Sequence, residues 1–96
     1  MHPRNITIGG KRYRFVWGDA GQLNGREAVG HCDNPAASNR RIVLEPRLDG
    51  GHNQMLRFLV HELLHGAAWD HDEAWVDKTS IEIAKVLYDF GFRREL

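Results

Sequence analysis

The stretch Val60-His61-Glu62-Leu63-Leu64-His65 decides which fold and which chemistry we expect of this chain. In a helix, residues four apart project from one face, one turn apart, so His61 and His65 can bind the same metal ion. Glu62 lies about 100° further round the helix, where it can take a proton from a water activated by that metal. The stretch therefore predicts a zinc site at His61 and His65, with Glu62 as the general base.

The motif lies in the most apolar part of the sequence. Met55 to Val60 precede it, and Leu63 and Leu64 lie inside it. Histidine is uncommon on the buried face of an apolar helix unless its ring nitrogens have partners, which favours a metal site over a chance match. We expect this helix to begin at an Asn53 N-cap and to continue through about Ala68.

Length and composition indicate one domain that spans residues 1–96. Hydrophobic residues make up 42% and charged residues 27% of the chain, as is ordinary for a globular protein. The formal net charge is zero, so composition gives no argument for a nucleic-acid partner or an anionic membrane.

Cys32 is the only cysteine, which excludes an intrachain disulfide and favours a reducing, cytoplasmic setting. We expect it to be a small, partly buried residue rather than a nucleophile. No apolar run approaches the roughly 18 residues of a membrane span, and the N-terminus lacks the apolar region of a secretory signal. The sequence therefore predicts a cytoplasmic protein without a membrane partner.

Short strands precede the motif. Residues Asn5 to Trp17 read as a hairpin that turns at Gly9-Gly10, and Gly18 to Gly25 as a loop. Ala28 to Asp33 is a weaker strand candidate, and Arg41 to Glu45, which ends at Pro46, is a clearer one.

A second helix is expected from Glu73 to about Phe90. Asp70 or Asp72 can cap its N-terminus, with Asp70 and Glu73 at capping-box spacing, and Gly91-Phe92 is typical of a Schellman ending. Its predicted apolar face comprises Val76, Ile83, Leu87 and Phe90. The expected fold is α+β: a small, mostly antiparallel sheet of about three strands, packed with the motif helix and a C-terminal backing helix.

Two residues compete to be the third metal ligand. His71 follows His65 by six residues, the spacing of H-E-x-x-H-x-x-G-x-x-H, but Ala68 stands where that pattern has its turning glycine. Glu73 opens the second helix, where a carboxylate is also favoured simply by the helix dipole. The spacing leaves Glu73, His71, Asp70, Asp72 or no third protein ligand open.

The motif and the segment Glu73-Ala74-Trp75-Val76-Asp77 resemble the gluzincins, the thermolysin-like clan of zincins. There the glutamate binds zinc and the aspartate accepts a hydrogen bond from a zinc-bound histidine. The resemblance implies these roles for Glu73 and Asp77, although gluzincins have a longer segment before the glutamate. His71 would then be free to stabilise the oxyanion.

A wider resemblance is carried by the stretches Gly30 to Asp33, the strand at Ile42, His61 to His65, Trp69-Asp70, Glu73 and Leu87 to Arg93. Through these stretches, about two-thirds of the chain is similar to small predicted zinc metallopeptidases of bacteriophage and prophage genomes. In that family pattern the acidic residue at Glu73 is part of the motif and position 71 varies, so the resemblance favours Glu73 as the ligand. It would place the protein in the host cytoplasm if it is phage-encoded.

These observations predict a minimal zincin-like metallopeptidase that hydrolyses a peptide or protein substrate with zinc and Glu62. We expect an extended peptide to lie along the strand Arg41–Glu45 by β-addition. Two other functions stay open. The H-x-x-x-H-x-x-x-x-x-H spacing, which ends at His71, also resembles metzincin-like bacterial endoribonucleases, although these have Gly at the positions of Glu62 and Ala68. A non-catalytic zinc-stabilised binding module would instead close the site with both Glu73 and His71.

Overall fold

The N-terminal hairpin forms as the alternation of its side chains predicts. The computed structural model describes residues 3–18, 22–23, 26–27, 30–45 and 51–92. Strands β1 (Arg4–Ile8) and β2 (Lys11–Trp17) pair antiparallel, with Ile6 opposite Tyr13. The turn between them places Gly9 and Gly10 at φ angles of 60° and 73°, which other residues rarely adopt. The predicted hairpin is confirmed.

Two later strands complete a four-stranded mixed sheet in the order β1-β2-β6-β5. Strand β6 (Arg41–Leu44) pairs parallel with β2, and β5 (Gly30–Cys32) pairs antiparallel with β6. Because β6 therefore has a neighbour on both sides, its backbone cannot accept a peptide by β-addition, and our expectation for the strand at Arg41–Glu45 is wrong. Among the strands that the structure describes, β1 and β5 form the two edges instead.

The segment between β2 and β5 departs from the predicted loop. Strands β3 (Gln22–Leu23) and β4 (Arg26–Glu27) form a separate two-stranded antiparallel ladder, so the loop expected over Gly18 to Gly25 is interrupted by β3. Two residues on each strand are too few for an alternation that could be recognised in the sequence. Ala28, Val29 and Pro46, which the sequence suggested in or beside strands, lie outside the described residues.

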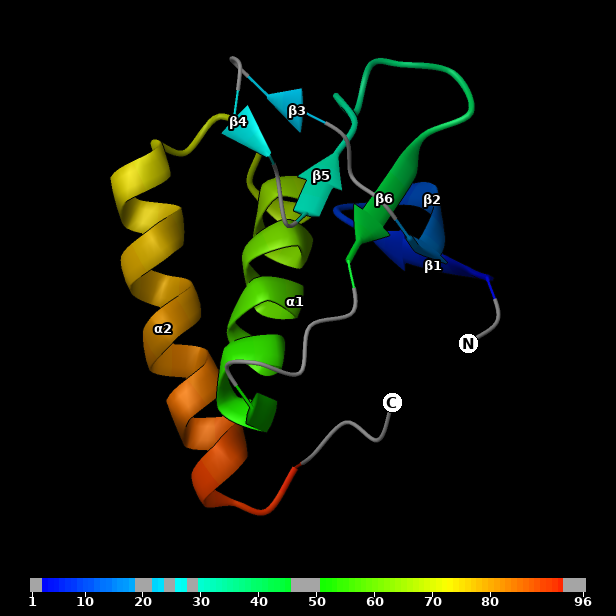
Figure 1. Cartoon of the computed structure of the whole chain (residues 1–96). Coiled ribbons are helices and arrows are strands. Elements are labelled where there is room, and N and C mark those ends of the chain that lie inside the picture. The colour runs from blue at the N-terminus through cyan, green and yellow to red at the C-terminus, as the bar shows by residue number, and fades with distance from the viewer. Residues whose placement is uncertain (1–2, 19–21, 24–25, 28–29, 46–50, 93–96) are drawn as a thin grey trace.

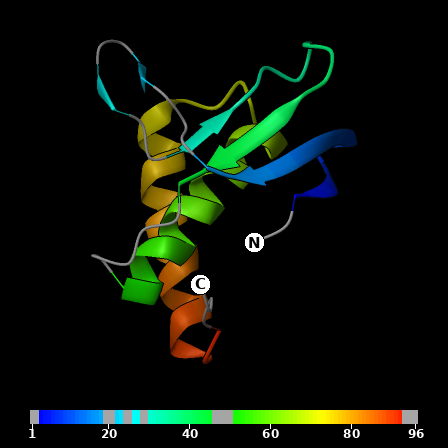
Figure 2. The same cartoon turned by 45° about the vertical axis from the view of Figure 1, so that its right-hand side comes forward.

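Two antiparallel helices follow the sheet, with α1 between the sheet and α2 (Figures 1 and 2). Helix α1 (Gly51–Ala67) carries the histidine motif, and helix α2 (Glu73–Asp89) contacts α1 and none of the described strands. The α+β expectation, with a motif helix and a backing helix, is confirmed. Asn53 lies inside α1 rather than at its N-cap, because the helix begins two residues earlier.

The hydrophobic core lies between the sheet and α1. Alternation along β2 turns Tyr13 and Phe15 toward α1, while Arg12 and Arg14 face solvent. The buried core cluster comprises Tyr13, Phe15, Cys32, Ile42, Leu44 and Met55. The sheet and the last turn of α1 approach closely at Gly66, where a Cβ would stand 2.8 Å from Cγ2 of Ile8.

Helix α2 buries small side chains rather than its large apolar ones. Val76, Ser80 and Ala84 are the buried residues, whereas Ile83 and Phe90 are exposed, so the predicted apolar face is wrong at these two positions. The helix ends in a Schellman motif as predicted: Gly91 has φ 94° and its N–H bonds Tyr88, while the Phe92 N–H bonds Leu87.

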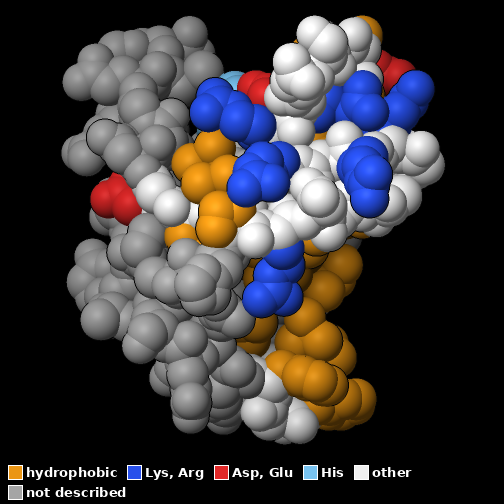
Figure 3. All heavy atoms as spheres, turned by 90° about the vertical axis from the view of Figure 1, so that its right-hand side faces the viewer, with side chains coloured by type: hydrophobic (Ala, Val, Ile, Leu, Met, Phe, Trp, Pro, Cys, Tyr) orange, Lys and Arg blue, Asp and Glu red, His pale blue; other side chains and the backbone are white. Residues whose placement is uncertain are grey.

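Lysine and arginine side chains gather on the side of the molecule where the sheet lies (Figure 3). Arg12, Arg14 and Arg41 are exposed there, whereas acidic side chains predominate on the helices. Although the net charge of the sequence is zero, charge is distributed unevenly between the sheet and the helices.

Candidate metal site

Helix α1 presents His61 and His65 side by side, as the four-residue spacing predicts. Their Nε2 atoms lie 3.1 Å apart, and each side chain is 20% exposed, at the margin of the core. The two rings meet edge to face, with centroids 4.8 Å apart. Both imidazoles therefore point the same nitrogen at one place beside α1.

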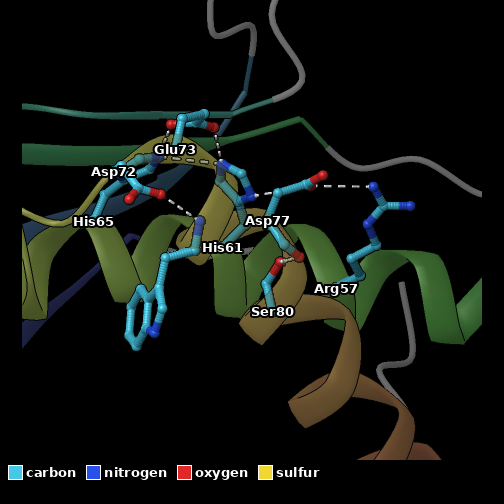
Figure 4. A network of polar contacts seen from close by, with 8 residues as sticks. Arg57, His61, His65, Asp72, Glu73, Asp77 and Ser80 are labelled. Carbon is cyan, nitrogen blue, oxygen red and sulfur yellow. Dashed lines mark hydrogen bonds and ion pairs between the residues drawn. The ribbon is translucent and has the colours of Figure 1, made fainter.

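Glu73 reaches the same place from the first residue of α2. Its Oε1 lies 2.9 Å from Nε2 of His61, and its Oε2 lies 3.1 Å from Nε2 of His65. Figure 4 shows the carboxylate facing both imidazoles. The Asp72 side chain, which accepts a hydrogen bond from the Trp75 N–H at 2.7 Å, caps the helix and fixes where Glu73 begins it.

The chemistry of these three groups fits a zinc ion. His61, His65 and Glu73 are a group of potential ligands from three side chains, drawn from the described residues. Ligand atoms around a tetrahedral zinc with bonds of 2.0–2.1 Å stand about 3.3 Å apart, close to the separations seen here. Burial lowers the pKa of His65, which favours the neutral imidazole that metals bind.

Asp77 lies behind His61, one turn along α2 from Glu73 (Figure 4). Its Oδ1 is 3.8 Å from Nδ1 of His61 and accepts a hydrogen bond from Nη2 of Arg57 at 3.3 Å. A carboxylate on this side favours a proton on Nδ1, which leaves the Nε2 lone pair directed toward Glu73. The 3.8 Å separation is too long for the hydrogen bond that the gluzincin resemblance implies, so this role of Asp77 stays a prediction.

The interaction of Arg57 with Asp77 was missed in the sequence. Arg57 precedes His61 by four residues, so the helical periodicity that identified His65 places Arg57 on the same face of α1. The sequence did not show that the packing of α2 on α1 places Asp77 beside this face of α1. This required the packing of two helices and not only the pattern within one.

Glu62 is turned toward the sheet and not into the donor group. Its side chain is 6% exposed and lies against Gly30 of β5. Burial, followed by the negative charge of Glu73, raises the pKa of Glu62 to about 7. A carboxyl group with this pKa can both accept and release a proton near neutral pH.

His71 lies outside the group formed by the two histidines and Glu73. It is exposed, and its ring packs on Trp75 with centroids 4.4 Å apart. The sharp turn that would bring a residue at this position back to the metal requires the glycine that Ala68 replaces. A role for His71 at the oxyanion stays a prediction. Asp70 is exposed as well, and Asp72 is used as the N-cap.

A second polar cluster lies at the start of the loop after β5. His31 Nε2 is 2.7 Å from Oδ1 of Asp33, whose other oxygen accepts the Arg41 N–H. Burial would raise the pKa of Asp33, but these hydrogen bonds outweigh it and lower the pKa. Cys32 points the other way, into the core, where burial and the charge of Glu62 raise its pKa to about 12. The thiol therefore stays protonated, as expected of a core residue.

No helix in the described part of the chain is both long and apolar enough to cross a membrane. Comparisons of the chain with protein-family models, with curated proteins and with solved structures each give no match.

Proposed function

We propose that this protein is a zinc-dependent metallopeptidase, with His61, His65 and Glu73 as the metal ligands and Glu62 as the general base. The observation that carries the proposal is the convergence of the Nε2 atoms of both histidines on the two oxygens of Glu73, at 2.9 and 3.1 Å. A zinc ion held there would polarise a carbonyl group and acidify a water molecule.

Proton transfer and the orientation of a metal ligand are assigned to other residues of the chain. Glu62 accepts a proton from the attacking water at its carboxylate and returns it to the leaving amine, which its pKa of about 7 allows in both directions. Asp77, supported by Arg57, orients the His61 ring.

Of the two edge strands, β1 and β5, β5 is the one that we propose accepts an extended peptide. Strand β6 pairs with β2 and β5, whereas β5 pairs only with β6 among the described strands. An extended peptide would add to β5 through main-chain hydrogen bonds. Because Gly30 of β5 lies against Glu62, a peptide on this edge would pass close to the general base. We further propose that the substrate is a cytoplasmic peptide or protein, in keeping with the single, buried cysteine.

Metal content identifies the ligands. Elemental mass spectrometry of the wild type, Glu73→Ala and His71→Ala should find about one zinc per chain in the wild type and in His71→Ala, and a loss of zinc in Glu73→Ala. Selective loss in His71→Ala would instead favour the metzincin-like arrangement, and RNA cleavage would then be the activity to assay.

The role of Glu62 is tested by Glu62→Gln. This variant keeps the size of the side chain and removes the base, so we expect it to retain zinc and to lose hydrolysis of a mixture of unstructured peptides by at least about 100-fold. Cleavage products are identified by mass spectrometry, before and after incubation with a chelator. Undiminished cleavage by Glu62→Gln would contradict the role of this residue.

A further inference from the structure

We propose that Gly30 is a positioning residue for Glu62: the missing side chain of Gly30 leaves the space in which the Glu62 carboxylate lies. The functional part of this inference rests on the proposed peptidase activity. The packing part does not, because it concerns only two residues and their contact.

The contact between Gly30 and Glu62 is too close for any other residue. A Cβ on Gly30 would stand 2.6 Å from Oε2, 2.8 Å from Cγ and 3.0 Å from Cδ of Glu62. Real Cβ atoms essentially never approach neighbouring atoms within 3.0 Å. The side chain of Glu62 therefore occupies the volume that an alanine at position 30 would fill.

Backbone conformation does not explain the glycine. The glycines with positive φ among the described residues are Gly9, Gly10 and Gly91, and Gly30 is not one of them. A glycine within a strand whose φ is ordinary indicates close approach of another group. Here the group is the carboxylate of Glu62.

The surroundings determine which of the two partners would move. Gly30 pairs with Leu44, a fully buried residue of the interior strand β6, so β5 cannot easily shift away from α1. On the other side, α1 is held by its packing against the core. The flexible carboxylate of Glu62 is the part that can yield, and its displacement would move the base without unfolding the protein.

The metal ligands would be spared by the same substitution. His61 and His65 point their Nε2 atoms at Glu73 of α2, whereas Glu62 is turned toward β5. A methyl group at position 30 would therefore affect the proposed general base and the proposed metal ligands differently. It would disturb the base and leave the zinc-binding group in place.

The catalytic test compares Gly30→Ala with Gly18→Ala, since a Cβ at Gly18 would meet nothing within 4 Å. For the wild type and both variants we would measure zinc content, kcat and KM on a peptide that the wild type cleaves. We expect Gly30→Ala to keep its zinc and its KM and to lose about 100-fold in kcat, the cost of a displacement of about 1 Å. Gly18→Ala should match the wild type. An unchanged kcat in Gly30→Ala would overturn the positioning role.

The packing test needs no activity. Thermal unfolding is compared for wild type, Gly30→Ala, Glu62→Ala and the double variant, all with excess chelator. Once Glu62 is shortened to alanine, the clash is gone, so Gly30→Ala should leave the midpoint unchanged or raise it. In the presence of Glu62, the effect of Gly30→Ala should be less favourable by about 4 °C or more. Equal effects in both backgrounds would overturn the inference.

The two tests separate the inference from the proposed function. The four proteins of the packing test can show coupling between positions 30 and 62 even if the wild type cleaves no peptide. That result would support the packing of Gly30 against Glu62 and contradict the peptidase. Peptide cleavage without coupling would support the peptidase and contradict the role of Gly30.

Discussion

Glu62 holds a carboxyl group where a negative charge is costly. Its side chain is almost fully buried, and Glu73 lies near enough to raise the pKa of Glu62 further, to about 7. The ordinary value is 4.5, so the folded protein binds this proton much more tightly than the unfolded chain does. The same property that suits a general base therefore makes stability depend on pH.

The free energy of unfolding of the metal-free protein should fall as the pH rises from 4.5 to 7 because of Glu62. Within this window Glu62 keeps its proton in the folded state and has lost it in the unfolded chain. The contribution of this proton to stability is therefore complete below pH 4.5 and is lost as the pH rises to about 7. A tenfold change in proton affinity is worth about 1.4 kcal/mol, so the contribution approaches about 3 kcal/mol. Urea denaturation across the window, with chelator present, measures it.

His65 contributes with the opposite sign, which makes Glu62→Gln the necessary control. Burial lowers the pKa of His65, so its contribution to stability grows as the pH rises toward its ordinary value of 6.5. Because both proteins contain His65, the difference between wild type and Glu62→Gln isolates the glutamate. Parallel pH profiles for the two proteins would contradict the raised pKa of Glu62.

Single residues were predictable where one helix determines their geometry. His61 and His65 could be paired from their spacing because an α-helix places residues four apart on one face. Glu73 could be chosen over His71 only through a resemblance, since the distance across a turn does not follow from residue number. The contact of Gly30 with Glu62 joins positions far apart in the sequence, and no local pattern reports it.

Helix α2 holds Glu73 in place through its N-terminal cap. Asp72 is extended, with φ −70° and ψ 157°, and its carboxylate accepts the Trp75 N–H. Glu73 follows as the first helical residue, so the cap determines both where the helix starts and where the Glu73 carboxylate lies. The capping box predicted from Asp70 and Glu73 is not formed, because the helix is capped by Asp72, two residues after the position that this pairing needs.

Asp72→Ala should destabilise the protein by about 1 kcal/mol, the usual cost of losing an N-cap side chain. For a domain of this size the unfolding midpoint should fall by about 4–8 °C. Zinc affinity, measured by competition with a coloured chelator, should weaken as well, because the first turn that carries Glu73 frays. Asp70→Ala, a change at an exposed residue nearby, is the matched control. Equal midpoints for the two variants would contradict the capping role of Asp72.

The helices and strands themselves were easier to predict from the sequence than the way in which they pair and pack. The hairpin, the clear strand at Ile42 and both helices follow from apolar periodicity and from turn residues such as Gly9 and Gly91. The interior position of β6 does not, because parallel pairing with β2 joins segments separated by β3, β4 and β5. The exposure of Phe90 is likewise unpredictable from α2 alone, since the partner helix decides which face is covered.

At the scale of the whole molecule, the described residues form a layered core and a polar junction between α1 and α2. The core lies between the sheet and α1, whereas α2 packs on α1 mainly through Val76, Ser80 and Ala84. A chain of 96 residues has a small core, so additional links contribute a large part of its stability. The group formed by His61, His65 and Glu73 is such a link between the helices.

Zinc should therefore stabilise the folded protein. At a free concentration one hundred times the dissociation constant, a ligand that binds only the folded state adds about 2.7 kcal/mol, which sets an upper limit of about 20 °C on the rise of the midpoint for a domain of this size. Differential scanning fluorimetry with zinc and with chelator measures the shift. Glu73→Ala should lose most of it, and a full shift in that variant would contradict the role of Glu73 as a ligand.

All three proposed ligands lie within residues 61–73, in two helices joined by a short turn. Such a chelate can close without the sheet, because the ring of chain between the first donor and the last is small and loses little entropy. A peptide limited to the helical hairpin should thus retain measurable zinc affinity. Partial capture of zinc by disordered chain reduces the gain in stability below what the affinity alone implies. The shift in the unfolding midpoint should then fall below the limit for a ligand that binds only the folded state, by an amount set by the zinc affinity of the disordered chain.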